Sequence, residues 1–312
     1  MSRLSVIVPT HNPHPVRLRR TLESLAAQSL DAQDWELIVV DNISEPRITR
    51  EILPPALTAN GRIVVEPRLG LSSARARGFR ESTGDSIVLV DDDNVLGPDY
   101  LQRALTLLDT HPEIGLLGGK SIPEFERAPA AWQEEFFPLL ALRDLGSAAL
   151  ISEPASRESV ARRTYPPFAP IGAGMVLRRR AAEAWLARSE HNPLSDRRGR
   201  ELSSGGDNDI VLCALEAGWR VAYFPDLSLT HLIPASRLAP DYLARLNRGI
   251  QKSWMQVLTL HDANPWAPLS ASGALLRSAK AWFVHRPWTS PVARIRYAGA
   301  RGHFEGRVPA SS

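Results

Sequence analysis

Four short runs of Val, Ile and Leu near the N-terminus constrain the fold more than any other feature of this 312-residue chain. Runs without polar alternation are typical of strands buried on both faces of a parallel sheet. About 20 to 27 residues lie between successive runs, enough for a crossover helix. The runs are Leu4–Val8, Trp35–Val40, Arg62–Glu66 and Ser86–Val90. They predict an α/β fold with a mostly parallel central sheet flanked by helices.

The middle of the chain is patterned differently. Seven prolines between Pro123 and Pro170 interrupt any helical or strand pattern of apolar residues, so we expect loops and short helices there. Helical patterns return at about 180–188 and in a stripe that stops at Gly218. Two strands should follow that stripe, and then a long helix over Tyr242–Leu260.

These changes of pattern along the chain predict one α/β domain over residues 1–235, with halves at 1–120 and 121–235, and a helical extension over 236–312.

Cys213 is the single cysteine, so neither an intrachain disulfide nor a cysteine-based zinc site can form. It lies in an apolar helical stretch and should only pack there. No apolar run approaches the roughly 20 residues of a membrane span. We expect a cytoplasmic protein, soluble or peripheral on the membrane.

Three consecutive acids, Asp91, Asp92 and Asp93, come directly after the fourth predicted strand. In an extended chain Asp91 and Asp93 would share one face, and Asp92 would take the other. Carboxylates this close repel one another, and a divalent cation such as Mg²⁺ or Mn²⁺ relieves the repulsion. The alternative is an acidic turn that caps a helix starting near Pro98.

Other polar residues should stand on the same rim of the sheet, because the carboxyl ends of parallel strands meet at one edge. Pro9, Thr10 and Asn12 follow the first strand, and Asp41 ends the second. Turn chemistry is the alternative role for Asp41, Thr10 and Asn12. The segment 70–78 is rich in Gly, Ser and Arg but matches neither the dinucleotide-binding fingerprint nor the P-loop.

Six motifs in order resemble family 2 glycosyltransferases, which have the GT-A fold. They are SVIVPTHNP, LIVVDNIS, GLSSARARGF, IVLVDDDN, IGAGMVL and GGDNDIVLCALEAGWRVAYFPD, between Leu4 and His231. The resemblance implies a nucleotide-sugar donor, a divalent metal (Mn²⁺ or Mg²⁺) on its diphosphate, and transfer with inversion to a hydroxyl of a glycan or lipid-linked acceptor. It also implies a place in cell-surface polysaccharide or glycolipid synthesis.

The resemblance also implies roles for individual residues. Asp91 and Asp93 match the acids of the family's D-x-D motif, with His231 completing the metal site, and Asp207 matches the general base. The residues implied in nucleotide-sugar binding are Pro9, Thr10, Asn12, Asp41, Arg75, Asp91 and Asp92. Two positions depart from the family pattern: Ala76 stands where an Asn is usual, and Gly206 replaces the Glu before the base.

Two of these roles have alternatives in the sequence itself. Asp209 lies two residues beyond Asp207, in the first turn of the same predicted helix, and is a rival for the base. Asp207 could instead cap that helix. His231 shares a strand face with Leu227 and Leu229, so a core histidine competes with a metal ligand.

Three other functions fit the sequence less well. A sugar-1-phosphate nucleotidyltransferase should open with a Gly-rich, basic loop, which PTHNPHP is not. A non-catalytic sugar-nucleotide-binding relative is suggested by Gly206. Nucleic acid is not expected as a partner, because short basic runs are usually solvated and no recognition motif accompanies them.

The C-terminal segment 275–312 carries a net charge of +6, while the rest of the chain carries −3. Four of the eight tryptophans lie nearby, at Trp254, Trp266, Trp282 and Trp288. Tryptophan suits the boundary of a bilayer, and basic residues are attracted to anionic lipids. Peripheral contact with an anionic membrane is therefore one hypothesis, and packing of these tryptophans on the sheet domain is the other.

Overall fold

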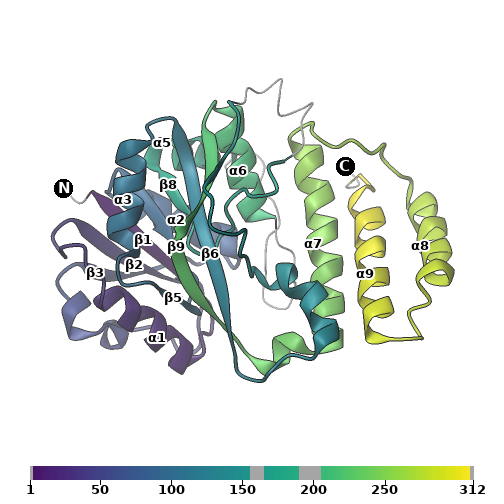
Figure 1. The fold of residues 1–312 in the computed structure, drawn as a ribbon, viewed down its shortest axis with the longest axis horizontal. Coiled ribbons are helices and arrows are strands. Elements are labelled where there is room, and N and C mark those ends of the chain that lie inside the picture. Colours follow the sequence, from purple (N-terminus) through teal and green to yellow (C-terminus); the bar gives the residue numbers. More distant parts are fainter. Residues whose placement is uncertain (1–2, 155–164, 190–204, 310–312) are drawn as a thin grey trace.

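The structure is a computed structural model that describes residues 3–154, 165–189 and 205–309. Strands β1 (Leu4–Thr10), β2 (Trp35–Asp41), β3 (Gly61–Val65) and β4 (Ser86–Leu89) pair in parallel in the order β3-β2-β1-β4 (Figure 1). Every residue of β1, β2 and β4 is buried. The prediction of an α/β fold from the four apolar runs is confirmed.

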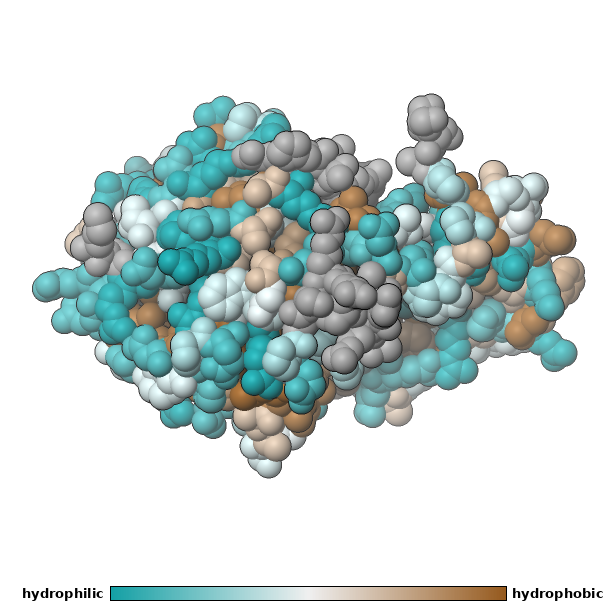
Figure 2. All heavy atoms as spheres, turned by 90° about the horizontal axis from the view of Figure 1, so that it is seen from above, coloured by the Kyte–Doolittle hydropathy of each residue, from teal (hydrophilic) through white to brown (hydrophobic). Residues whose placement is uncertain are grey.

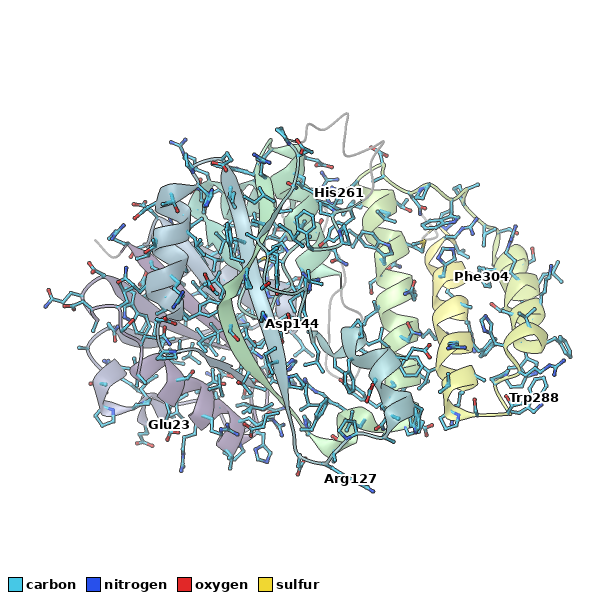
Figure 3. All side chains as sticks on the ribbon, viewed as in Figure 1. Glu23, Arg127, Asp144, His261, Trp288 and Phe304 are labelled. Carbon is cyan, nitrogen blue, oxygen red and sulfur yellow. The ribbon has the colours of Figure 1, made fainter. Side chains whose placement is uncertain are left out.

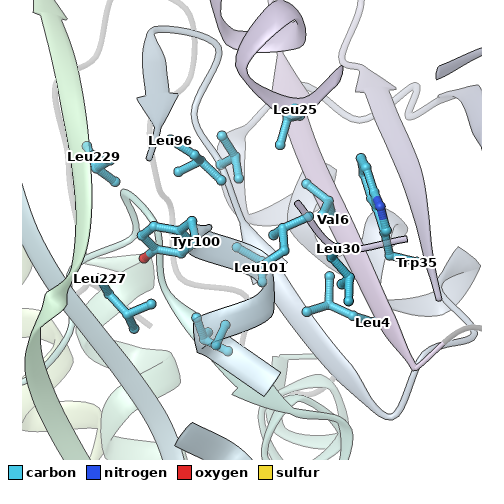
Figure 4. Close-up of a cluster of buried hydrophobic side chains, with 14 of the residues drawn as sticks. Leu4, Val6, Leu25, Leu30, Trp35, Leu96, Tyr100, Leu101, Leu227 and Leu229 are labelled. Carbon is cyan, nitrogen blue, oxygen red and sulfur yellow. The ribbon is translucent and has the colours of Figure 1, made fainter. Parts of the chain in front are cut away.

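Helices cover both faces of this sheet. Helices α1 (Pro15–Ala26) and α3 (Tyr100–Thr110) pack on the face that carries Leu4 and Val6, and Figure 4 shows Leu25, Tyr100 and Leu101 in this cluster. Helices α2 (Leu71–Glu81), α5 (Arg179–Ser189) and α6 (Gly206–Glu216) pack on the opposite face. Alternate residues of β1 thus point into two different cores, which is why the strand reads as continuously apolar.

The sheet continues beyond β4 with mixed pairing. Strand β8 (Val176–Arg178) is antiparallel to β4 and to β6 (Ile114–Phe125), and β6 is parallel to β9 (Arg220–Ile233). Two short strands, β5 (Asn94–Leu96) and β7 (Leu150–Ile151), are antiparallel to β9.

The prediction of two strands after Gly218 is wrong, because β9 is one strand of 14 residues. Pro225 and Asp226 look like a turn in the sequence, yet they lie in an irregular stretch where the pairing of β9 with β6 shifts register. Strand β9 continues because its partner β6 also continues. Beyond the irregular stretch the pairing of β6 with β9 resumes, from Lys120 opposite Ser228.

The proline-rich middle segment is more ordered than predicted, since β6 runs through Pro123 to Phe125. Beyond it lie the 3₁₀ helix η3 (Ala131–Leu140) and β7, which agrees with the expected short elements. Short 3₁₀ turns also occur elsewhere: η1 (Arg50–Ile52), η2 (Pro55–Leu57) and η4 (Ala235–Leu238).

The C-terminal extension is helical, as predicted. Helices α7 (Pro240–Leu260), α9 (Pro291–Gly306) and α8 (Ala271–His285) lie side by side in that order, outward from the sheet (Figure 1). Gly302 and Gly306 allow α9 to approach α7 closely, because a Cβ at either position would collide with the backbone of α7. Among the described residues, no helix combines the length and apolar character needed to cross a membrane.

Candidate active site

A pocket of about 360 Å³ opens at the edge of the sheet where β1, β2 and β4 end. Ligands of open α/β sheets bind at this edge. Its walls come from the whole length of the chain. Thr10 and Asn42 follow β1 and β2, Asp207 begins α6, His231 lies in β9, and Tyr242 lies in α7. The topology therefore brings the N-terminal half, the second half and the extension to one cavity.

The three acids after β4 all line this pocket. The N–H of Asn94 donates to the carbonyl oxygen of Asp91 at 3.0 Å, so the segment turns instead of extending. The predicted alternation of the three side chains is wrong for that reason, since it holds only in an extended chain. The carboxylate of Asp92 accepts a hydrogen bond from the hydroxyl of Thr10. All three acids therefore reach one cavity.

The same turn rules out the alternative that these acids cap a helix. Strand β5, which the sequence pattern did not predict, follows at once, and α3 begins only at Tyr100, with Asp99 at its N-cap. The acids are thus free of any helix-capping role.

The acids of the turn repel one another. Burial raises the pKa of Asp91, and repulsion from Asp93 and Asp207 adds to this, while Arg75 opposes it. Burial and the neighbouring Asp93 likewise raise the pKa of Asp92 to about 7. A site that holds several carboxylates this close together is one that a cation stabilises.

Asp93, His231 and Arg237 form a compact group at the back of the pocket. Asp93 and His231 are 4% exposed each. The Nε2 atom of His231 lies 3.3 Å from Oδ1 of Asp93, and Nη2 of Arg237 lies 2.9 Å from Oδ2 of Asp93. His231 is therefore both a buried residue, as its apolar strand neighbours suggested, and a residue of the pocket wall.

The group suits a divalent cation. Two carboxylates and an imidazole are donors that Mn²⁺ and Mg²⁺ accept in combination with phosphate oxygens. Within the described ranges, the buried Nδ1 of His231 has no hydrogen-bond partner, so no second bond locks the ring. Arg237 supplies the positive charge beside Asp93 in this structure, and its Nη1 lies 3.1 Å from Nε2 of His231.

Asp207 faces the acids from the opposite wall. It lies in the first turn of α6, whose N-cap is Gly205, so capping is not its role. Its carboxylate pairs with the guanidinium of Arg75 and accepts a hydrogen bond of 2.8 Å from the backbone N–H of Gly172. Arg75 is 1% exposed and also lies 3.9 Å from Asp91. A Cβ at Gly172 would meet both charged groups and would displace their side-chain ends.

Asp209 is bound into a different cluster. It is 3% exposed and does not line the pocket. Its Oδ2 accepts from the indole N–H of Trp185 at 2.6 Å, and its Oδ1 lies 2.8 Å from Nε2 of His261. The other ring nitrogen of His261 lies 2.7 Å from Glu216. Figure 3 shows His261 at the end of α7, beside α6. Asp209 therefore holds helices together.

Asp209, Cys213 and His261 also form, in the part of the chain that the structure describes, the one group of three potential metal ligands within 4.8 Å of one another. Both imidazole nitrogens of His261 are already engaged by carboxylates. Hydrogen bonds between the His261 imidazolium and the two carboxylates thus explain why these side chains lie close together. Cys213 is buried beside it in the core, as predicted.

The residues predicted to hold the nucleoside divide into two pairs. Pro9 and Thr10 line the pocket, whereas Asn12 and Asp41 do not. Asp41 is fully buried and accepts hydrogen bonds from the backbone N–H groups of Ser44 (2.9 Å) and Ile48 (3.3 Å). Asn12 accepts from the N–H of Glu45 at 2.7 Å. Asn12 and Asp41 shape the loop after β2, which is the turn chemistry left open above.

Several pocket residues escaped the sequence analysis. Arg237 lies in η4, six positions beyond His231. Its basic side chain is the only signal of its role in the sequence. Asn42 lines the pocket in place of its neighbour Asp41. Tyr242, Leu246 and Ile250 lie on one stripe of α7 and close the pocket from the extension.

Comparisons with known proteins agree with this arrangement. The model of the family described as "Glycosyl transferase family 2" matches residues 5–186, more than half of the chain. The match includes the three acids and ends before Asp207 and His231.

Two curated relatives align over most of the chain. A glucosyl-dolichyl phosphate glucuronosyltransferase of Haloferax volcanii is 23% identical over 82% of this chain and 78% of its own length. An N-acetylglucosaminyltransferase of Bradyrhizobium diazoefficiens is 27% identical over 75% of this chain, which spans only 45% of that relative. This chain spans only 13% of the length of another relative, an uncharacterized protein of Sinorhizobium fredii.

A solved structure with the same fold is a mannosyltransferase of Pyrobaculum calidifontis in complex with GDP-Man and Mn²⁺. It superposes with a TM-score of 0.58 over 96% of this chain and 86% of its own, at 18% identity. The family match and the fold lead to one conclusion. The chain belongs to glycosyl transferase family 2 and has the GT-A fold.

Proposed function

We propose that this enzyme is metal-dependent and transfers a sugar, with inversion, from a nucleotide-sugar donor to a hydroxyl of a glycan or lipid-linked acceptor. The observation that carries the proposal is the placement of Asp207 across one pocket from Asp91 and Asp93, with Arg75 between them. One wall suits a diphosphate with its cation, and the other offers a carboxylate to an incoming hydroxyl.

In the proposed reaction, the acceptor oxygen bonds to the anomeric carbon as the bond from that carbon to the diphosphate oxygen breaks. The hydroxyl proton passes to the carboxylate of Asp207, a general-base contribution of about 10²- to 10⁴-fold. Attack opposite the leaving group inverts the anomeric centre. Gly172 and Arg75 orient the Asp207 carboxylate, because both donate hydrogen bonds to it.

Asp91, Asp93 and His231 would hold the Mn²⁺ or Mg²⁺, with Asp92, Arg75, Pro9 and Thr10 beside the nucleotide-sugar. The cation would neutralise charge on the diphosphate as it leaves. The mannosyltransferase of the same fold binds GDP-Man with Mn²⁺, which supports this donor class. Asn12 and Asp41 would contribute by shaping the loop beside the nucleoside.

We propose a lipid-linked acceptor over a free glycan, in polysaccharide or glycolipid synthesis at the cytoplasmic face of the membrane. The name of the Haloferax volcanii relative includes a sugar on dolichyl phosphate, which is a lipid. The apolar wall that Tyr242, Leu246 and Ile250 of α7 add to the pocket is compatible with such an acceptor.

A panel of nucleotide-sugars, screened by thermal shift with and without Mn²⁺, identifies the donor, because bound ligand raises the apparent stability. Transfer is then measured with lipid-linked and free glycan acceptors, and the anomeric configuration of the product is read by NMR. We expect Asp207→Asn to keep the donor-induced shift and to lose at least about 10²-fold in transfer.

Asp226→Asn is the matched control, because Asp226 is an acid of β9 whose side chain is 73% exposed, outside the pocket. It should transfer at the rate of the unmodified chain. Full transfer by Asp207→Asn would remove the base assignment. Retention of the anomeric configuration would contradict the inverting mechanism. Release of pyrophosphate from a nucleoside triphosphate and a sugar phosphate would identify a nucleotidyltransferase, and binding without turnover a non-catalytic relative.

A further inference from the structure

Helix α8 turns its large apolar side chains outward. It buries the small residues Ala274, Ser278 and Ala281 on its inner face. By contrast, Leu275 and Leu276 are each 73% exposed. A helix that only stabilised the fold would bury its leucines, so the outer face of α8 calls for a separate explanation.

The exposed apolar residues form a continuous ridge. Leu275, Leu276, Ala279 and Phe283 follow the spacing i, i+1, i+4 and i+8, which places them on one side of a helix. Phe283 is 72% exposed. We call these four residues the α8 ridge. Figure 2 shows apolar side chains gathered at the end of the molecule formed by the C-terminal helices.

Two tryptophans extend the ridge at the end of α8. Trp282 and Trp288 remain 43% and 58% exposed although their rings lie 5.6 Å apart. Trp254 and Trp266, by contrast, pack on Tyr165 and His303. Of the four, Trp254 packs against a buried core, whereas Trp266 remains 43% exposed like Trp282. Trp282 and Trp288 are the pair that lies beside the α8 ridge, and membrane contact through them stays a prediction.

The charged residues of α8 and of the turn that follows it are all basic. Helix α8 contains no acidic residue, and Arg277, Lys280 and the following Arg286 are all exposed. Among the described residues, none of these three cations forms an ion pair with an acid. Exposed tryptophan and leucine beside unpaired cations match the boundary of an anionic lipid layer.

A groove lies next to the ridge, between α7, α8 and α9, with a volume of about 630 Å³. Leu275 and Phe283 form part of its apolar wall, while Arg248, Lys252, Arg301 and Glu305 come from the helices opposite. Glu305 pairs with both Arg248 and Arg301, at 2.7 Å each. The groove therefore offers its apolar wall to the acyl chain of a lipid.

A second copy of this chain is the competing occupant of the ridge. A two-fold symmetric contact brings the same patch of both copies together. It would place Arg277 and Lys280 near their own counterparts, and like charges brought together in this way are destabilising. The cations therefore favour an anionic bilayer over self-association.

We propose that the α8 ridge docks the enzyme on an anionic lipid bilayer, entering the headgroup region by about 5–10 Å, while the surrounding cations contact lipid phosphates. The inference deepens the proposed function and rests on it for the reason to dock, a lipid-linked acceptor. Helix α9 joins α8 to α7, whose residues line the active-site pocket. Docking would therefore hold the pocket within two helix widths of the ridge, on the order of 20 Å.

The test is flotation of the full chain with vesicles of phosphatidylcholine alone or with phosphatidylglycerol, at low and high salt. We expect flotation with the anionic vesicles that weakens as salt rises. The double substitution Leu276→Ser and Phe283→Ser should weaken vesicle binding by about 100-fold, since each removes a large apolar side chain from lipid. Both side chains are exposed, so the melting temperature should not change.

Val16→Ser is the matched control, because Val16 is an apolar residue of α1 that is 58% exposed and remote from α8 in sequence. It should float as the unmodified chain does. The proposal is overturned if anionic vesicles do not retain the chain at low salt, or if the double variant binds them equally well. A dimer in sedimentation that the double variant abolishes would assign the ridge to a second copy instead.

The two proposals fail separately. Loss of flotation with intact sugar transfer to a soluble acceptor would refute docking alone. Intact flotation without transfer from any nucleotide-sugar would refute the proposed reaction and leave the ridge as a lipid-binding surface.

Discussion

Replacing His261 by alanine should lower the free energy of unfolding by about 3 kcal/mol, the lower end of the range for breaking a buried ion pair. The side chain of His261 is fully buried between two carboxylates, at 2.8 Å from Asp209 and 2.7 Å from Glu216. Its removal leaves both acids without their shared cation. The lower end applies because each acid keeps one other donor: Trp185 for Asp209 and Arg188 for Glu216.

The loss converts to a measurable shift in melting temperature. The entropy of unfolding is about 2.1 cal/mol/K per residue, or about 0.65 kcal/mol/K for this chain of 312 residues. A loss of about 3 kcal/mol then lowers the melting temperature by about 5 °C. His14→Ala is the matched control, because His14 is exposed and makes no capping hydrogen bond. It should change stability by less than about 0.5 kcal/mol.

The effect should depend on pH with a definite sign. Burial lowers the pKa of His261, but the hydrogen bonds to Asp209 and Glu216 outweigh it and raise the pKa above 6.5. The folded chain thus keeps a proton that the unfolded chain loses. The stabilisation is complete below pH 6.5 and is lost as pH rises through the folded-state pKa. The difference between the unmodified chain and His261→Ala should shrink over that window.

Thermal and urea unfolding, monitored by circular dichroism between pH 5.5 and 9, measure these quantities. A loss below about 1 kcal/mol, or a difference that grows as pH rises, would refute the imidazolium network. A chelator provides a second check, because a metal held by Asp209, Cys213 and His261 would be removed by it. We expect EDTA to leave the melting temperature of the Asp93→Asn variant unchanged, because that variant lacks the metal site of the pocket.

Three further predictions concern the pocket. Asp93→Asn should abolish the Mn²⁺-dependent thermal shift with the donor while leaving the ligand-free melting temperature within about 2 °C, as unfolding curves will show; an unchanged Mn²⁺ titration would remove Asp93 from the metal site. Arg237→Met should tighten Mn²⁺ binding in the absence of donor, measured by calorimetry, because it removes the competing cation from Asp93; weaker binding would contradict this. Gly172→Ala should lower transfer by about tenfold or more at an unchanged Mn²⁺ affinity, because the added Cβ displaces Arg75 and Asp207; a normal rate would show that their position is not critical.

The parallel strands could be predicted because their signal is local. Each apolar run is continuous, and the β1–β2 and β2–β3 ladders need only short crossovers between neighbouring runs. The β1–β4 ladder joins runs that are not neighbours in the chain, and only the tertiary structure places them side by side. The acids after β4 could be placed at the rim for the same reason, since the end of a strand is visible in the sequence.

The second half depended on contacts that no local pattern records. Strand β9 continues through Pro225 because β6 pairs with it on both sides of the irregularity. Strand β5 is only three residues long and exists because β9 lies beside it. Short strands of this kind are stabilised by their partner and carry little signal of their own.

The sequence by itself determined which residues are chemically able to act, and the tertiary structure decided which of them do so together. Asp207 and Asp209 are two acids in one helical turn, and they separate only because α6 turns one toward Arg75 and the other toward His261. His261 lies 52 residues away from Asp209 in the chain. A helix presents neighbouring residues to different surroundings, so the packing of α5 and α7 against α6 assigns one acid to the pocket and one to the core.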